Sequence, residues 1–391
     1  MDAEALFRIY RDDLLGDTLP FWMRHAVDHE DGGFTISLDR DGTVVDTDKA
    51  VWQQARFTWL LGEVYNDPLF ESAARRDEWL ELALHGADFL EKHCVDPSDG
   101  RMWYLLTKEG RPLRKRRYAF TESFAAIAFG ELFRAAGVAR YRDLAQRAFD
   151  TFVAHEVEPK WTGERPMRSL SIPMITIGTA QELRESIGLE GANERIDAAI
   201  TVIRDLHVRE DMQCVLESVG MDGGFVDTFD GRLLNPGHAI EAAWFVLREA
   251  RHRNDGDLCE LGCKILDWSW ERGRDAEYGG LLYFVDARGL PVSEYWHDMK
   301  FWWPHNEAII ATLMAFAMTG ERRYAEWHAE VHDWAHERFR DREHGEWFGY
   351  LHRAGTISST LKGNHWKGPF HMPRMQIQCA RLARSLSSPA V

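Results

Sequence analysis

The stretch Glu122-Ser-Phe-Ala-Ala-Ile-Ala-Phe-Gly-Glu-Leu-Phe-Arg-Ala-Ala136 carries apolar residues at spacings of three and four. This spacing gathers apolar side chains on one side of a helix, and strong helix formers fill the other positions. Residues 238–250 and 305–318 repeat the pattern. The three stretches predict long helices with large buried faces, and therefore an all-α fold.

A turn pattern occurs four times between the predicted helices. Each copy has acidic residues followed by glycine, then a short aromatic run and a second glycine turn, and the copies are marked by Gly33, Gly100, Gly280 and Gly345. The turn residues and the aromatic residues predict a short β-hairpin in each copy. The first two copies lie 67 residues apart and the last two lie 65 residues apart.

A repeat of that length fits two helices joined by a hairpin, and 391 residues leave room for about six such units. Six helical hairpins closed into a ring form an (α/α)6 barrel. We therefore expect residues 1–391 to form a single (α/α)6-barrel catalytic domain, with short β-hairpins in the connecting loops.

The composition restricts the class of function. With 45% apolar and 12% aromatic residues, the chain can bury a sizeable core. A formal net charge of −16 argues against a nucleic-acid partner, which needs a basic surface. The N-terminus has no basic region followed by an apolar run, and no long apolar span follows, so we expect no membrane partner and a cytoplasmic location.

Two histidines suggest the chemistry. His238 lies in Asn235-Pro-Gly-His and His371 lies in Gly368-Pro-Phe-His, each among residue types that often line sugar sites. Imidazole titrates near neutrality, so two of them can remove a proton from one face of a carbon and return it to the other. That is the chemistry of epimerisation. The alternative for His371 is a turn that leads into the last helix.

Glu241 follows His238 by three residues, which places both side chains on one face of a helix. A carboxylate there can orient the imidazole or bind a sugar hydroxyl, and the alternative is an ordinary surface pair. Further candidates for the sugar site also have structural alternatives. The tryptophans can belong to the aromatic core, an Arg can reach solvent, a Glu can be a charge at a helix N-terminus, and a His can be structural. They are Arg56, Glu122, Trp303, His305, Trp366 and Arg374.

Metal and nucleotide sites have little support. His328, His332 and His336 are spaced by four on one predicted helix, which we interpret as a solvated stripe rather than a metal site. The five cysteines contain no Cys-x-x-Cys pair, and we interpret Cys259 and Cys263 as packing residues. The chain has no standard phosphate-binding loop, so we expect no cofactor, and nucleotide activation has no support from the sequence.

The motifs around these residues resemble the N-acylglucosamine 2-epimerase family over essentially the whole chain. In family order they are Val51-Trp-x-Gln-x-Arg56, Asn235-Pro-Gly-His-x-x-Glu-Ala242, Lys300-x-Trp-Trp-Pro-His-x-Glu-Ala308, Gly345-Glu-Trp-Phe-Gly-Tyr-Leu351 and Phe370-His-x-Pro-Arg374. The resemblance implies an (α/α)6 barrel, a homodimer, and no required metal or redox cofactor. It implies that His238 and His371 are the acid/base pair, and that Arg56, Glu241, Trp303 and Trp366 line the sugar site.

The resemblance implies a sugar 2-epimerase, an isomerase that interconverts N-acetylglucosamine and N-acetylmannosamine. Glu122 and the Trp-Trp-Pro-His-x-Glu motif are similar to the N-acetylglucosamine branch, whereas Trp366 is similar to the disaccharide branch. Epimerisation of mannose, glucose or cellobiose and aldose–ketose isomerisation are therefore alternatives. A glycoside hydrolase would need two positioned carboxylates, for which Glu122 and Glu241 are the candidates. A non-catalytic sugar-binding protein is the remaining alternative.

Overall fold

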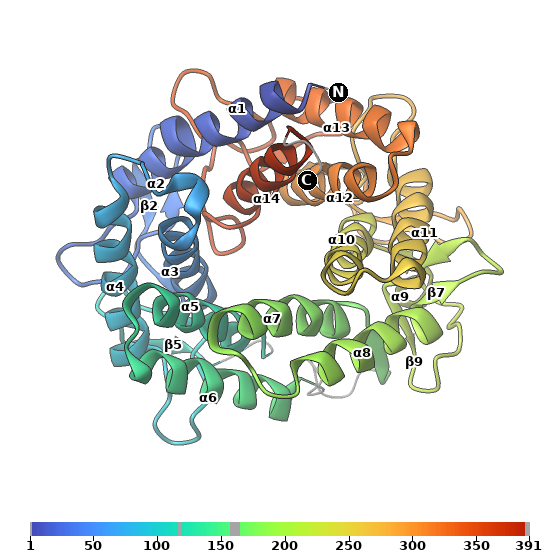
Figure 1. The fold of residues 1–391 in the computed structure, drawn as a ribbon. Coiled ribbons are helices and arrows are strands. Elements are labelled where there is room, and N and C mark those ends of the chain that lie inside the picture. Colours follow the sequence, from blue (N-terminus) through green and yellow to red (C-terminus); the bar gives the residue numbers. More distant parts are fainter. Residues whose placement is uncertain (1, 116–118, 157–164, 388–391) are drawn as a thin grey trace.

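The helices form two concentric rings in the computed structural model, which describes residues 2–115, 119–156 and 165–387 (Figure 1). Within this part of the chain, six helices form the inner ring: α3 (Val51–Asn66), α5 (Phe120–Ala136), α7 (Ser171–Ile187), α10 (Pro236–Arg253), α12 (Trp302–Thr319) and α14 (His371–Ser387). Six others form the outer ring: α1 (Ala3–Asp13), α4 (Arg76–His93), α6 (Ala139–His155), α8 (Ala192–Val202), α11 (Gly256–Gly273) and α13 (Arg322–Arg338). Short helices are α2 (Leu19–His25), α9 (Phe229–Arg232), η1 (Leu14–Thr18), η2 (Pro68–Phe70) and η3 (Ile203–His207).

The inner ring is closed. Each inner helix packs on the next one along the chain, from α3 to α14, and α14 returns to contact α3. Each inner helix also packs on one outer helix, and the first outer helix, α1, packs on the last inner helix, α14. The predicted (α/α)6 barrel is thus confirmed, and the two ends of the chain complete it together.

The extent to which a helix is buried depends on whether it lies in the inner or the outer ring. Residues 121–132 of α5 and 302–315 of α12 are all buried, since an inner helix is covered on every side. The outer helix α6 fully buries only Ala145, Phe149 and Phe152, and its other residues are partly or fully exposed. None of the described helices is both long enough and apolar enough to cross a membrane.

The strands lie in the connections between helices. They are β1 (Ser37–Leu38), β2 (Val44–Asp46), β3 (Lys49–Ala50), β4 (Leu105–Leu106), β5 (Pro112–Arg114), β6 (Met167–Ser169), β7 (Val208–Arg209), β8 (Cys214–Val215), β9 (Ser218–Gly220), β10 (Leu233–Leu234), β11 (Val285–Asp286), β12 (Lys300–Phe301) and β13 (Tyr350–Leu351). The first two predicted hairpins are present as β1–β2 and β4–β5. In the third copy β11 pairs with β10 of a neighbouring connection instead. In the fourth copy β13 pairs with β12, and Leu351 also forms an antiparallel bridge with Ile357, so a short hairpin is present there as well.

In each of the four predicted turns a buried aspartate forms an ion pair with a lysine, and the lysine is buried in every pair except Asp96–Lys115. An aspartate accepts hydrogen bonds from backbone N–H groups of its own turn and binds a lysine that follows it by 19 to 25 residues. The pairs are Asp28–Lys49 (2.9 Å), Asp96–Lys115, Asp275–Lys300 (2.8 Å) and Asp341–Lys362 (3.0 Å). The pair explains why the acidic turn recurs, because it anchors a polar connection against the helix layer.

The interpretation of His328, His332 and His336 as a solvated stripe is wrong. His328 is 1% exposed and His332 is 8% exposed, and all three rings contact Tyr10 of α1. The Tyr10 hydroxyl lies 2.7 Å from His332 Nδ1 and 3.2 Å from His328 Nε2. These histidines therefore attach the N-terminal helix to α13.

Candidate active site

The two histidines and Trp303 lie at the starts of three neighbouring inner helices. His238 is the third residue of α10, Trp303 the second of α12 and His371 the first of α14. Asn235 caps α10 by accepting a hydrogen bond from the His238 backbone N–H at 3.2 Å, and Pro236 opens the helix. Helix N-termini carry partial positive charge, so this end of the barrel favours a ligand that develops negative charge.

Trp303 contacts both imidazoles. Its ring centroid is 5.1 Å from that of His238 and 5.7 Å from that of His371. The backbone of Gly237 makes this arrangement possible, since a Cβ there would lie 2.6 Å from the Trp303 ring. The structure thus brings together three residues that are distant in sequence.

His238 is oriented by Glu217, which precedes β9. The His238 Nδ1 atom lies 3.0 and 3.1 Å from the two carboxylate oxygens, so Nδ1 carries the proton and donates it. Burial lowers the pKa of His238, but the carboxylates of Glu217, and after it Glu241 and Glu307, outweigh burial and leave the pKa above its usual value. The His238 side chain is 28% exposed.

His371 has a different environment. Its Nδ1–H donates to Glu307 Oε1 at 2.7 Å, and the same oxygen accepts a hydrogen bond from Arg374 Nη2 at 2.8 Å. Glu307 Oε2 accepts from Trp244 Nε1 at 2.7 Å. Burial, followed by the nearby Arg374 cation, holds the pKa of His371 well below its usual value. Within the described residues, the Nε2 atoms of both histidines make no hydrogen bond to protein.

Glu241 does not orient His238, contrary to the prediction from their spacing. Glu241 binds Arg374 Nη2 instead, because a buried carboxylate pairs more strongly with a guanidinium than with an imidazole. The two carboxylates that do hold the histidines, Glu217 and Glu307, are not among the predicted site residues. Glu307 lies in the motif that begins at Lys300, but the motif does not show that its side chain faces α14. Glu217 lies in no motif.

Arg374, predicted to bind substrate, lies behind His371 and is engaged by Glu241 and Glu307. Its guanidinium therefore organises the two carboxylates. Arg56 is buried, and its guanidinium lies over the rings of Trp52, Phe124 and Phe370 at 4.8, 4.0 and 4.6 Å.

Trp366 and Glu122 lie near the Arg56 side of the site. Trp366 is 42% exposed and contacts Trp52 edge to face, with centroids 5.4 Å apart. Glu122 is buried and accepts hydrogen bonds from Arg101 Nε at 2.7 Å and from the Met102 backbone N–H at 3.1 Å. Glu122 thus forms a structural ion pair at the start of α5.

His305 is not brought to the site. Its Nδ1–H donates to the Phe301 carbonyl at 2.7 Å, and its Nε2 accepts from the Leu281 N–H at 3.0 Å. The ring stacks on Trp334 of the outer helix α13, and burial lowers the pKa of His305 to about 3. His305, predicted to bind the sugar, is thus a buried structural histidine.

Two carboxylate clusters have spacings that would suit a metal ion. Ligand atoms of Glu241, Glu307 and His371 lie within 4.8 Å of one another, but Arg374 already places a positive charge between the two carboxylates. Glu63, Glu131 and Glu182 form the second cluster, at the C-terminal ends of α3, α5 and α7. Each of these has its own arginine partner, respectively Arg381, Arg134 and Arg248. Both clusters therefore suit guanidinium groups better than a metal.

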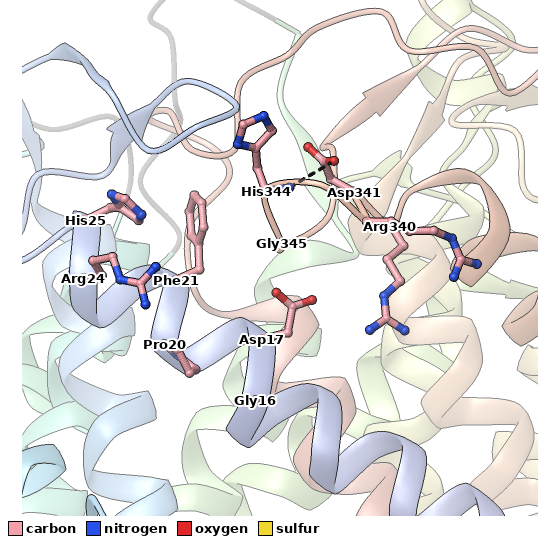
Figure 2. A pocket seen from close by; sticks show the side chains of 11 residues that line it. Gly16, Asp17, Pro20, Phe21, Arg24, His25, Arg340, Asp341, His344 and Gly345 are labelled. Carbon is pink, nitrogen blue, oxygen red and sulfur yellow. Dashed lines mark hydrogen bonds between the residues drawn. The ribbon is translucent and has the colours of Figure 1, made fainter.

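A separate hollow of about 540 Å³ lies on the outside of the barrel, between α2 and the turn that follows α13 (Figure 2). Phe21 and His344 face each other across it, with Asp17 below. Neither His238 nor His371 lines this hollow. The histidine site and the hollow are thus different places on the molecule.

Comparison with known proteins agrees with the geometry. The family described as N-acylglucosamine 2-epimerase (GlcNAc 2-epimerase) matches residues 32–371. The chain is 37% identical to the N-acylglucosamine 2-epimerase of Bos taurus, over 96% of this chain and 90% of the bovine protein. The Mus musculus protein of the same name is 35% identical, over 96% and 94%. The structure of cellobiose 2-epimerase from Spirochaeta thermophila DSM 6192 superimposes with a TM-score of 0.84 at 20% identity, covering 99% of this chain and 98% of that one.

Proposed function

The chain belongs to the N-acylglucosamine 2-epimerase family and is a sugar 2-epimerase, and we propose that it interconverts N-acetylglucosamine and N-acetylmannosamine with His238 and His371 as its two bases. The choice of substrate is supported by the names of the relatives that are 35–37% identical to it. The choice of bases is supported by the contact that both imidazoles make with the same Trp303 ring.

The proposed reaction proceeds on the open-chain sugar. The aldehyde acidifies the C2–H bond, and the Nε2 atom of one histidine removes that proton to give an enolate-like intermediate. Negative charge develops on O1, where the Arg56 cation and the N-termini of the inner helices stabilise it. The second histidine donates a proton from its Nε2 to the opposite face of C2. The two histidines exchange roles when the reaction runs in the other direction.

The arrangement of the histidines is the observation that carries this proposal. Each Nδ1–H is held by a carboxylate, which fixes the ring and directs Nε2 away from that carboxylate. The two candidate carboxylates for hydrolysis, Glu122 and Glu241, are instead neutralised by Arg101 and Arg374. A pair of available acids, which glycoside hydrolysis requires, is therefore not formed by these two residues.

The test uses two substitutions and a solvent label. We expect His238→Ala and His371→Ala each to lose epimerisation by at least about a hundredfold, the scale of a lost acid–base group, while remaining folded. The exposed His252→Ala is the control and should keep wild-type turnover. In deuterated water the product should carry deuterium at C2 by NMR. Near-wild-type turnover by either site variant would contradict the two-base proposal.

A panel of free sugars tests the substrate. N-acetylglucosamine, N-acetylmannosamine, mannose, glucose and cellobiose are each assayed for both epimer and ketose. We expect the highest kcat/KM for the two N-acetyl sugars and no ketose. Ketose formation from mannose would favour the aldose–ketose isomerase alternative.

We further propose that residues 1–391 form one catalytic domain, since contacts between α14 and α3 close the inner ring. A homodimer without a required metal or redox cofactor is the state that the family resemblance implies, and a cytoplasmic location is the expectation from the N-terminal sequence. Sedimentation velocity and cell fractionation test the dimer and the location. Turnover after exhaustive dialysis against a chelator and without nucleotide tests the absence of a cofactor.

A further inference from the structure

The two histidines have carboxylate partners that differ in how far their charge is neutralised. Glu217 directs both of its oxygens to His238 Nδ1, and no lysine or arginine among the described residues pairs with it. Glu307 shares one oxygen between His371 and Arg374 and uses the other for Trp244. A carboxylate that serves one imidazole alone favours the imidazolium far more than one already paired with an arginine.

The other charged groups around the two histidines also favour the proton on His238 rather than on His371. The charged or titratable groups that face His238 are Glu217, Glu241 of its own helix, Glu307 of α12 and His371 of α14. Those that face His371 are the cations Arg374 and Arg56, the carboxylates Glu241 and Glu307, and His238. His371 thus has carboxylates that are already paired with Arg374, whereas His238 also has the unshared carboxylate of Glu217.

Resting on the proposed two-base function, we propose that Glu217 is a positioning residue that keeps the single proton of the resting histidine pair on His238, so that His371 begins as the neutral base. The sugar epimer whose C2–H faces His371 then reacts directly with the resting enzyme. His371 takes its proton, and the His238 imidazolium donates one to the other face of C2.

Each turnover in this direction leaves the pair inverted, with a cationic His371 beside Arg374 and a neutral His238. The enzyme returns to rest when His371 loses a proton and His238 gains one from solvent. The His238 side chain is 28% exposed and that of His371 is 11% exposed, so His238 has the more direct access to solvent for this exchange.

The test compares Glu217→Gln with Glu217→Asp and with a matched control, Glu210→Gln. Glu210 lies in the nearby β7–β8 turn, is 68% exposed and pairs with Lys264, so its loss removes one negative charge without touching His238. The first measurement is the pH profile of kcat/KM. We expect Glu217→Gln to move the basic limb to lower pH by at least about one unit, the scale of a lost neighbouring opposite charge, and to leave the acidic limb in place. Glu217→Asp should restore part of the shift, and Glu210→Gln should show none.

The second measurement does not depend on turnover. An NMR titration follows the His238 ring resonance, assigned by its absence from a His238→Gln spectrum, and we expect its pKa to fall by at least about one unit in Glu217→Gln. Wild-type turnover combined with an unmoved basic limb and an unmoved His238 titration would overturn the role of Glu217. Failure of the wild-type enzyme to convert any sugar would overturn the proposed function instead.

Discussion

At the scale of single residues, the site depends on close contact between Gly237 and Trp303. A Cβ at position 237 would lie 2.6 Å from two atoms of the Trp303 ring, and that ring contacts both His238 and His371. We therefore expect Gly237→Ala to displace the ring and lower kcat by up to about a hundredfold, as misplacements near 1 Å do. Steady-state kinetics and a thermal melt measure the two effects. Unchanged kcat in a folded variant would show that the Trp303 position is not critical.

Glu307 gives a second prediction at this scale. Glu307→Gln keeps the size of the side chain but offers His371 Nδ1 an amide that can present either its oxygen or its nitrogen, so the ring loses its fixed tautomer. We expect kcat to fall by at least about a hundredfold, the contribution of one acid–base group, with little change in KM. A large rise in KM at constant kcat would instead indicate that Glu307 acts on substrate binding.

The sequence predicts some of these residues and not others, for reasons of spacing. His238, Trp303 and His371 are recognisable because each stands in a motif of several unusual residues. Glu217 is 21 residues from His238 and reaches it only because β9 pairs with β6 beside the barrel mouth. Glu241 has the right spacing for His238, but the sequence does not reveal that Arg374, 133 residues away, competes for it.

At the scale of elements, the buried Asp–Lys pairs fasten the connections to the helix layer. Lys49 is 0% exposed and donates to Asp28 and to the carbonyl oxygens of Gly32 and Lys108. Lys49→Met removes the cation and leaves a buried carboxylate, and we expect the free energy of unfolding to fall by about 3–5 kcal/mol. Lys108→Met is the matched control, because the Lys108 side chain is 30% exposed and pairs with surface carboxylates of the same turn. Equal stability of the two variants in urea would contradict this anchoring role.

The sequence predicts the positions of the turns, but it does not predict which strands pair with each other. Glycines with positive φ, such as Gly33 (66°) and Gly345 (78°), mark turns by a local requirement that the sequence displays directly. Strand pairing is not local. β11 pairs with β10, whose paired residues are 51 and 53 positions earlier, because the barrel brings adjacent connections together at its rim.

At the scale of the whole molecule, the ring closes through the two ends of the chain. The sequence predicted six units from four readable turns, and it could not show that α1 supplies the outer partner of α14. Helix α1 has few buried residues for this contact, and Tyr10 is one of them. Tyr10 reaches His328 and His332, so the attachment of α1 depends on histidines that must be neutral when buried.

This dependence predicts a loss of stability in acid. Burial, and after it neighbouring histidines, lower the pKa of His328 and His332 to about 3, whereas in the unfolded chain histidine titrates near 6.5. Below pH 6.5 the unfolded state therefore binds protons that the folded state does not, so stability is complete above that pH and falls as the pH decreases towards 3. Each such histidine contributes a slope of about 1.4 kcal/mol per pH unit. The free energy of unfolding is measured in urea at pH 7, 6 and 5. We expect its decrease with falling pH to be smaller in His332→Leu by the contribution of one histidine, and to be unchanged in the exposed His252→Leu. Parallel profiles for the wild-type protein and His332→Leu would mean that His332 is protonated in the folded state and does not make the attachment of α1 sensitive to acid.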